Sequence, residues 1–193
     1  YPAAIVDYRT LPSHYPAALA DVMRAVRMVR AHGKSWNLPV DHIALLGESA
    51  GGQLAAITAT QPDFYRDPND DLAATISAKP DLLVLLYPLV SAVSPTRHGS
   101  VDRWLGTYAT DRFRASISPE LHVSGDAPPT ILFHAADDPI VSWQNSLDLA
   151  EAYWRVGASA ELHVFPHGGH GHEFAYSSAI SETWRSLLLR WLE

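Results

Sequence analysis

The amino-acid sequence predicts an α/β fold with a mostly parallel sheet and flanking helices. Short apolar runs suited to buried strands alternate with stretches in which apolar residues recur at helical spacing. No repeat or low-complexity tract interrupts this alternation. The length of 193 residues is enough for one domain to bury a substantial core, so we treat 1–193 as a single domain.

The elements of the first half follow in chain order from local patterns. Ala3–Val6 is a short apolar run that ends in a polar loop, and we expect a buried strand there. Apolar residues recur at helical spacing from Leu19 to Val29, and Gly33 provides the expected end of that helix. Ile43–Leu46 is the second expected strand. The small residues of Leu54–Thr60 continue as a helix that ends before a proline.

The second half repeats the alternation. Leu82–Leu86 is continuously apolar, as a central parallel strand should be, and Thr130–His134 resumes the pattern. A helix is expected from about Ser142, whose hydroxyl can cap it, to a glycine at position 157. Glu161–Phe165 is the last expected strand, and Ile180–Trp191 carries its apolar residues on one helical face. Between these elements, residues 91–129 have no clean period.

Charge and composition exclude several classes of function. The 14 basic and 21 acidic residues give a net charge of −7, which argues against nucleic acid and anionic membrane as main partners. The absence of cysteine excludes disulfide scaffolds, thiol nucleophiles and cysteine-based zinc sites. It leaves the cellular compartment open, because a cysteine-free fold tolerates either redox environment.

The strongest chemical signal is the run Gly47-Glu48-Ser49-Ala50-Gly51-Gly52. It reads G-x-S-x-G between an expected strand and an expected helix, which is the context of a nucleophile elbow. The small residues on either side, Gly47 and Gly51 above all, allow the sharp turn that exposes the Ser49 hydroxyl. The N–H of Ala50 would then face a developing oxyanion. The alternatives are a plain tight crossover and a phosphate-binding turn of the P-loop type, and the latter needs a lysine that this run lacks.

A serine nucleophile needs a histidine base and a carboxylate that orients the base, in the chain order Ser, Asp or Glu, His. Asp137 and Asp138 follow one expected strand; we assign Asp138 as the orienting carboxylate and expect Asp137 to shape the turn. His170 lies between glycines after the last expected strand, so its backbone can bring the ring over Ser49. The loop also contains His167 and His172, which we expect at the surface.

The histidine-rich stretch leaves one alternative open. Together with His163, these loop histidines could gather around zinc, although no partner ligand of recognisable spacing occurs elsewhere. We therefore predict neither a metal nor another cofactor.

Further blocks of sequence carry a resemblance to a known family. They are Asp7-Tyr8-Arg9, 47–52, 96–100, Trp104-Leu105-Gly106, Ser118-Pro119-Glu120, Pro128-Pro129, 134–138, Asn145-Ser146 and 168–171. Together they resemble the α/β-hydrolase fold and, more narrowly, its acetyl-xylan-esterase-like branch of esterases and lipases. The family commonly has Phe-Gly-Leu after the block that ends at Gly171, whereas this chain has His172-Glu173-Phe174, a departure at the wall of the acyl pocket.

The resemblance implies a partial fold. Ala3–Val6 matches the fourth strand of the family sheet, so the N-terminal strands would be absent, together with the His-Gly-Gly-type loop that supplies the second oxyanion donor. We expect a missing N-terminal segment or a partner chain to complete the sheet, since a fourth strand without its neighbours would leave unpaired edges.

The resemblance also implies deacetylation of xylan-type carbohydrate or hydrolysis of other short-chain acyl esters, through an acyl-enzyme and without a cofactor. Residues 91–129 would form a cap-like insertion over the pocket. Glu48, Trp104 and Tyr108 are candidate substrate contacts; packing within the cap is the alternative for the two aromatic rings. Two other functions stay open: a peptidase or amidase on the same fold, and an inactive hydrolase-like binding module.

Overall fold

The computed structural model describes residues 2–94, 98–171, 174 and 178–193. Its centre is a sheet of four parallel strands in the order in which they occur along the chain. These strands are β1 (Ala44–Glu48), β2 (Leu82–Leu86), β3 (Thr130–Ala135) and β4 (Ala160–Phe165). Because the strands are parallel, their carboxyl ends meet at one edge of the sheet, where side chains from separate loops can converge.

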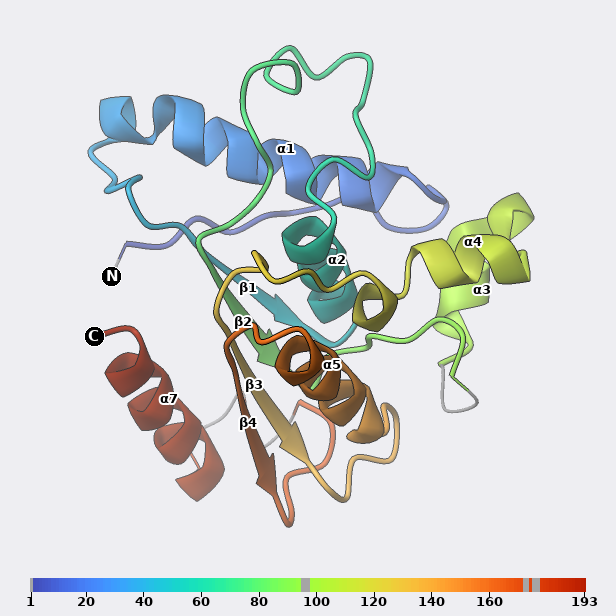
Figure 1. The fold of residues 1–193 in the computed structure, drawn as a ribbon, viewed down its shortest axis with the longest axis vertical. Coiled ribbons are helices and arrows are strands. Elements are labelled where there is room, and N and C mark those ends of the chain that lie inside the picture. Colours follow the sequence, from blue (N-terminus) through green and yellow to red (C-terminus); the bar gives the residue numbers. More distant parts are fainter. Residues whose placement is uncertain (1, 95–97, 172–173, 175–177) are drawn as a thin grey trace.

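Helices cover both faces of this sheet, as Figure 1 shows. The α-helices among the described residues are α1 (Ala17–His32), α2 (Ser49–Thr60), α3 (Ser100–Leu105), α4 (Asp111–Ser116), α5 (Gln144–Arg155) and α7 (Ala179–Trp191). Short 3₁₀ turns occur at Gly33–Trp36, Gly106–Tyr108 and Pro119–Leu121. The mostly parallel sheet with flanking helices that the sequence predicts is confirmed.

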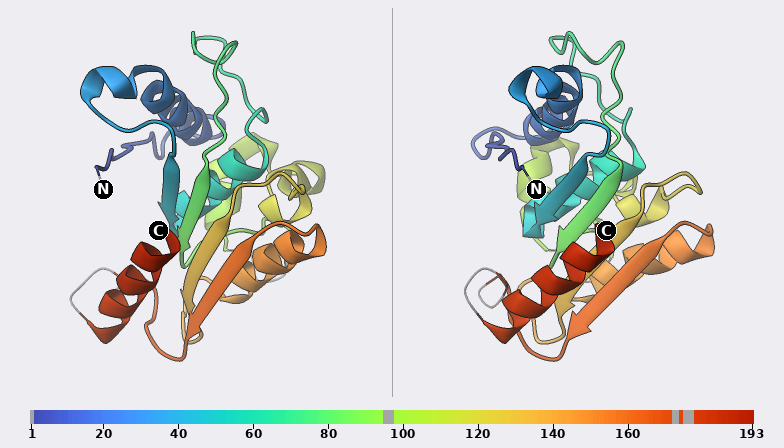
Figure 2. Two further views of the ribbon diagram at one scale, coloured as in Figure 1. Left: turned by 60° about the vertical axis from the view of Figure 1, so that its left-hand side comes forward. Right: turned by 90° about the vertical axis from the view of Figure 1, so that its left-hand side faces the viewer.

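The core divides into two layers because alternate strand residues point to opposite faces. On one face, Leu83 and Leu132 pack against α2 and α5. On the other face, Val84 and Phe133 pack against Trp184 of α7. Both views in Figure 2 show α7 on its own side of the sheet. The helical spacing of apolar residues in 180–191 therefore predicted the buried face of α7 correctly.

The expected strand at Ala3–Val6 is wrong: the chain there forms neither helix nor strand, and the Ile5 side chain is 96% exposed. A four-residue run becomes a strand only when another strand pairs with it, and within the described residues β1 pairs with β2 alone. The outer edge of β1 is accordingly open, and Leu46 on it is 46% exposed. Ala3–Val6 does not pair with β1. Such a pairing would have contradicted the expectation that strands next to β1 are absent.

A smaller correction concerns the start of α5. We expected Ser142 to cap this helix, but the helix begins at Gln144 with Trp143 at the capping position. The Ser142 hydroxyl lies just outside the helix and accepts a hydrogen bond from the Gln144 N–H at 3.3 Å.

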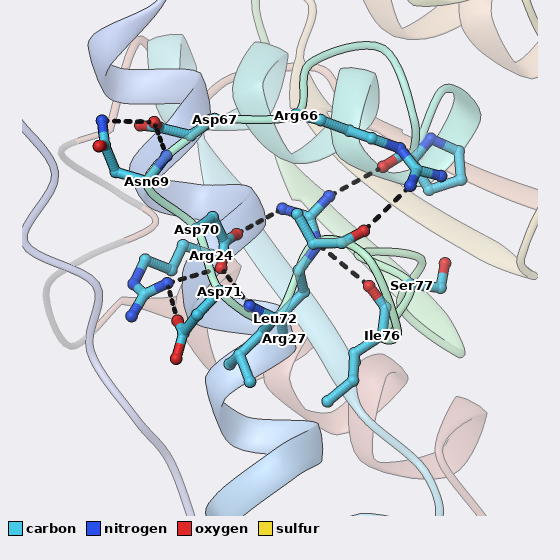
Figure 3. Close-up of polar contacts among 12 residues, drawn as sticks. Arg24, Arg27, Arg66, Asp67, Asn69, Asp70, Asp71, Leu72, Ile76 and Ser77 are labelled. Carbon is cyan, nitrogen blue, oxygen red and sulfur yellow. Dashed lines mark hydrogen bonds and ion pairs between the residues drawn. The ribbon is translucent and has the colours of Figure 1, made fainter.

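The segment between α2 and β2 is held by a buried ion pair. It passes over α1 in Figure 1, and Figure 3 shows the polar contacts that fasten it there. Arg27 of α1 and Asp70 of the segment are each 1% exposed, with 2.8 Å between Nη1 and Oδ2. Arg24 adds a second contact to Asp70 at 2.6 Å, and Arg27 Nε donates to the Ile76 carbonyl. Removing one member of such a pair leaves a buried charge without compensation.

Part of the 91–129 segment packs beside α1 and α2. Val101, Leu105 and Ile117 belong to the same apolar cluster as residues of α1 and α2. The cap-like role of 91–129 remains a prediction, and Thr96 and Arg97 of the family resemblance lie outside the described residues. No helix in the described part of the chain combines the length and the apolar character needed to cross a bilayer.

Candidate active site

Ser49 is the first residue of α2 and follows β1 directly, so the strand turns into the helix at this residue. Its φ of +50° is rare for a residue with a side chain, which fits the strained turn that the G-x-S-x-G pattern predicts. A Cβ on Gly47 would lie 2.5 Å from the Gly51 carbonyl oxygen. A Cβ on Gly51 would meet nothing nearer than the Tyr8 hydroxyl at 3.6 Å.

The steric need for glycine therefore differs from the prediction at one position. Gly47 is required, but Gly51 has room for a methyl group. The second tight position is Gly52, where a Cβ would lie 2.7 Å from the Pro88 Cβ. The sequence could not reveal this, because Pro88 reaches the elbow only through the pairing of β1 with β2.

The structure brings Ser49, His170 and Asp138 together at the carboxyl edge of the sheet. The Ser49 Oγ lies 2.9 Å from His170 Nε2, and His170 Nδ1 lies 2.7 Å from Asp138 Oδ2. These residues follow β1, β4 and β3, so the carboxyl ends of three strands supply them. The Asp138 side chain is 0% exposed and that of His170 is 14% exposed. This geometry allows a proton to pass from the serine to an imidazole whose other nitrogen is held by a carboxylate.

The Asp138 carboxylate is strongly stabilised in its charged form. Burial alone would raise its pKa, but hydrogen bonds outweigh burial and lower the pKa to about 2. The donors are His134 and His170 together with the backbone N–H groups of Val141 and Ile140. Both backbone groups bind Oδ1, at 2.9 and 2.8 Å, which leaves Oδ2 for the two rings. The backbone of its own loop therefore fixes Oδ1, and the two histidine rings contact Oδ2.

The neighbouring carboxylate, Asp137, holds the histidine loop instead. Its Oδ1 accepts a hydrogen bond from the Gly169 N–H at 2.9 Å, and Oδ2 lies 3.3 Å from Nδ1 of the exposed His167 ring. The backbone hydrogen bond from Gly169 lowers the pKa of Asp137. Gly169 and Gly171 have φ of +58° and +82°, so the glycines on both sides of His170 supply the backbone freedom that the sequence suggested.

Tyr87 stands behind His170 and is a residue that the sequence reasoning missed. Its ring meets the His170 ring edge to face at a centroid distance of 4.9 Å, and its hydroxyl donates to Glu48 Oε2 at 2.7 Å. Burial, followed by the nearby Glu48 carboxylate, raises the pKa of Tyr87 far above its usual value. Tyr87 directly follows β2, and a polar side chain at the carboxyl end of a parallel strand was the signal available in the sequence.

A second missed residue is His134, the penultimate residue of β3. Its ring is 0% exposed, and Nε2 lies 3.3 Å from Asp138 Oδ2. His134 stands in one of the blocks that carry the family resemblance, yet the sequence offered no role for it. Its position beneath Asp138 emerges only when the 138–141 turn folds back over the end of β3.

The predicted oxyanion donor and substrate contacts lie as follows. Ala50 is the second residue of α2, and N–H groups in the first turn of a helix have no intrahelical acceptor. Glu48 binds Tyr87 as described. Trp104 of α3 and Tyr108 pack around Tyr15, at ring-centroid distances of 5.8 and 5.2 Å. Trp104 also packs against the buried apolar cluster that includes Leu105 and residues of α1 and α2.

The histidines of the metal alternative are dispersed where they can be placed. His163 stacks on Phe133 and pairs with Glu161, whereas His167 lies on the surface beside Asp137. Among the residues that the structure describes, no group of three or more His, Cys, Asp or Glu side chains could hold a metal ion. His172 and Glu173, the site of the family departure, fall outside those residues.

Comparisons with known proteins identify the family of this chain and its similar structures. The chain matches the family described as BD-FAE over residues 1–153. It is 31% identical to endo-1,4-beta-xylanase B of Butyrivibrio fibrisolvens over 174 residues, which are 88% of this chain and 27% of that protein. It is 26% identical to the acetylxylan esterase of Xylanibacter ruminicola over 177 residues, which are 88% of this chain and 34% of that protein.

Among solved structures, the acetyl ester-xyloside bifunctional hydrolase from Caldicellulosiruptor lactoaceticus superposes with a TM-score of 0.87 at 38% identity. That match covers 96% of this chain and 68% of the other. The chain thus spans only part of each relative, about a quarter to a third of the two curated ones. The predicted resemblance to α/β-hydrolase esterases of the acetylxylan-esterase type is confirmed. The chain belongs to the BD-FAE family.

Proposed function

We propose that this chain carries the nucleophile and the acid–base pair of a serine-dependent carboxylic ester hydrolase. The observation that carries the proposal is the continuous line of contacts from Ser49 Oγ through His170 to Asp138, at 2.9 and 2.7 Å. Such a line gives a weakly nucleophilic hydroxyl a base within reach and keeps that base in one tautomer. The esterase relatives support the same reaction class.

The chemistry divides into two transfers of an acyl group. Ser49 Oγ attacks the ester carbonyl carbon while its proton moves to His170 Nε2; the tetrahedral intermediate then expels the alcohol, which takes that proton. Water attacks the resulting acyl-serine with His170 as base, and the carboxylic acid leaves as Ser49 regains its proton. Asp138 stays ionised throughout and stabilises the imidazolium form of His170.

The oxyanion formed in both steps needs donors, and we assign the Ala50 N–H as one of them. The second donor would come from a segment or chain that pairs with the open edge of β1. The exposed Leu46 side chain and the single pairing partner of β1 among the described residues support this assignment. Loss of one oxyanion donor typically lowers turnover by about 10²–10³-fold. We therefore expect a protein that has only the Ala50 donor to turn over esters more slowly, by about this factor, than one that has both donors.

Acetyl or other short-chain acyl esters of xylan-type carbohydrate are the proposed substrates. The names of the acetylxylan esterase and the acetyl ester-xyloside hydrolase support this class. Trp104 and Tyr108 are proposed substrate contacts, because the rings of their aromatic cluster could stack against a sugar ring. Glu48, the third proposed substrate contact, accepts a hydrogen bond from the Tyr87 hydroxyl.

The direct test is hydrolysis of p-nitrophenyl acetate by the wild type and by Ser49→Ala. We expect Ser49→Ala to abolish turnover while its thermal unfolding matches that of the wild type. Equal hydrolysis by both proteins would refute the proposal. An aminoacyl p-nitroanilide, measured in parallel, distinguishes a peptidase from an esterase, and acetylated xylo-oligosaccharides test the carbohydrate class.

A further inference from the structure

His134 has a role that the triad alone does not explain. Burying an imidazole in a protein core is unfavourable unless its nitrogens find partners. Both nitrogens of His134 have one: Nδ1 lies 2.8 Å from Ser146 Oγ, and Nε2 lies 3.0 Å from the Val141 carbonyl oxygen. The ring and Ser146 are both 0% exposed, so water does not compete for these contacts.

The partners define which nitrogen carries hydrogen. A carbonyl oxygen only accepts, so Nε2 must donate to Val141. In the neutral ring Nδ1 then accepts from the Ser146 hydroxyl, and this hydrogen bond fixes the tautomer. The N–H on Nε2 also lies 3.3 Å from Asp138 Oδ2, the oxygen that binds His170.

His134 therefore contacts the Asp138–Val141 turn at two atoms, the Val141 carbonyl oxygen and Asp138 Oδ2. It binds the Val141 carbonyl, while the Val141 N–H binds Asp138 Oδ1 at 2.9 Å. It also places the Nε2–H, whose hydrogen carries a partial positive charge, 3.3 Å from Oδ2, the oxygen that also contacts His170. A small tilt of the carboxylate would move His170 relative to Ser49, and reacting groups that shift by about 1 Å can lose about 10²-fold in rate.

We propose that His134, kept in one tautomer by Ser146, is the positioning residue of the Asp138 carboxylate. It touches neither substrate nor nucleophile and acts through Asp138 and the turn that presents it. This inference rests on the proposed ester hydrolase function for its kinetic consequence. The contact itself can be tested without turnover.

The experiment compares His134→Phe, His134→Gln and Ser146→Ala with the wild type. His134→Phe keeps a buried ring and removes both hydrogen bonds, whereas glutamine keeps an N–H donor for Val141. The matched control is His122→Gln, because His122 Nε2 also contacts a carbonyl oxygen, that of Ala115, at 2.9 Å. Each variant is measured for kcat and KM on p-nitrophenyl acetate, and for the downfield proton resonance of His170 Nδ1–H.

We expect His134→Phe to lower kcat about 10- to 100-fold with KM changed less than about threefold, and to shift or broaden the Nδ1–H resonance. His134→Gln should recover most of the kcat. Ser146→Ala should lower kcat in the wild-type background and add nothing in the His134→Phe background, because Ser146 acts through His134. His122→Gln should leave both readouts unchanged.

Unchanged kcat and resonance in His134→Phe would overturn the inference, as would an equal loss from Ser146→Ala in both backgrounds. If His134→Phe does not fold, Ser146→Ala and His134→Gln decide: a wild-type resonance and kcat in Ser146→Ala overturn it. If the wild type itself shows no turnover that depends on Ser49, the proposed function fails. The resonance in the same variants still tests the contact.

Discussion

Replacing Asp138 by asparagine should disable the site through the wrong histidine tautomer. Oδ1 accepts the N–H groups of Ile140 and Val141 at 2.8 and 2.9 Å, so the amide oxygen must occupy that position. The amide NH₂ then faces His170 Nδ1 in place of the oxygen at 2.7 Å. A flipped amide would instead turn its NH₂ group toward the N–H groups of Ile140 and Val141, and both would lose their acceptor.

With an NH₂ group beside it, His170 Nδ1 must accept, and the hydrogen moves to Nε2. An Nε2–H cannot take the proton of Ser49 at 2.9 Å. The same substitution in a serine protease triad lowers kcat about 10⁴-fold, roughly 5 kcal/mol of transition-state stabilisation. We expect a loss of about 10³–10⁴-fold in kcat on p-nitrophenyl acetate.

Asp137→Asn is the matched control. Asp137 is adjacent, and an amide oxygen can still accept from Gly169, so kcat should stay within about threefold of the wild type. A comparable loss in both variants, or an Asp138→Asn variant that retains most of its kcat, would show that the tautomer of His170 does not control activity.

The depressed pKa of Asp138 gives this variant a second signature. Since the folded-state pKa is about 2 against an ordinary 3.8, the ionised carboxylate stabilises the fold above about pH 4. That contribution, on the order of 2 kcal/mol, is lost as the pH falls from about 4 towards 2. The difference in unfolding free energy between wild type and Asp138→Asn, measured by urea titration, should shrink by this amount over that range. A difference independent of pH would contradict it.

Three further predictions concern the buried ion pair on α1 and the packing around the site. Asp70→Asn should lower the free energy of unfolding in urea by about 3–5 kcal/mol, because it leaves Arg27 buried without its charge partner. Asp71→Asn, on the exposed neighbour, should change it by less than about 0.5 kcal/mol. Equal effects of the two substitutions would contradict a stabilising role of the buried pair. Gly47→Ala should lower the free energy of unfolding by about 1–3 kcal/mol, because the new Cβ would lie 2.5 Å from the Gly51 carbonyl oxygen. Gly51→Ala should lower it less, so a Gly51→Ala variant that unfolds at a lower urea concentration than Gly47→Ala would contradict this prediction. Tyr87→Phe should lower the free energy of unfolding by about 1 kcal/mol, because the hydrogen bond to Glu48 is lost. The ring still packs on His170, so kcat should be largely retained. A large loss of kcat would show that the hydroxyl itself is needed.

The sequence predicted what depends on local pattern. Leu82–Leu86 forms the strand expected there, and Gly33 follows the last residue of α1. The elbow is likewise a local event, because a G-x-S-x-G run between a strand and a helix demands a sharp turn. Glycines beside His170 and two aspartates after β3 placed the acid and base on loops that parallel strands bring to one edge.

What the sequence could not predict depends on which segments meet in space. The apolar run at Ala3–Val6 has strand composition, but strand formation requires a partner that the described chain does not offer. The need for Gly52 comes from Pro88, and the roles of His134 and Tyr87 come from loops that fold back over strand ends. Each of these contacts joins residues that are distant in the chain or lie on opposite sides of a turn. Composition and periodicity do not determine such contacts.

Activation of the Ser49 hydroxyl by His170 and Asp138 can be measured with a fluorophosphonate probe and peptide mapping by mass spectrometry. We expect one covalent adduct, on the peptide that contains Ser49. We expect no adduct in Ser49→Ala and strongly slowed labelling in Asp138→Asn. A folded wild-type chain that stays unlabelled at Ser49, or labelling that persists in Ser49→Ala, would show that this hydroxyl is not activated.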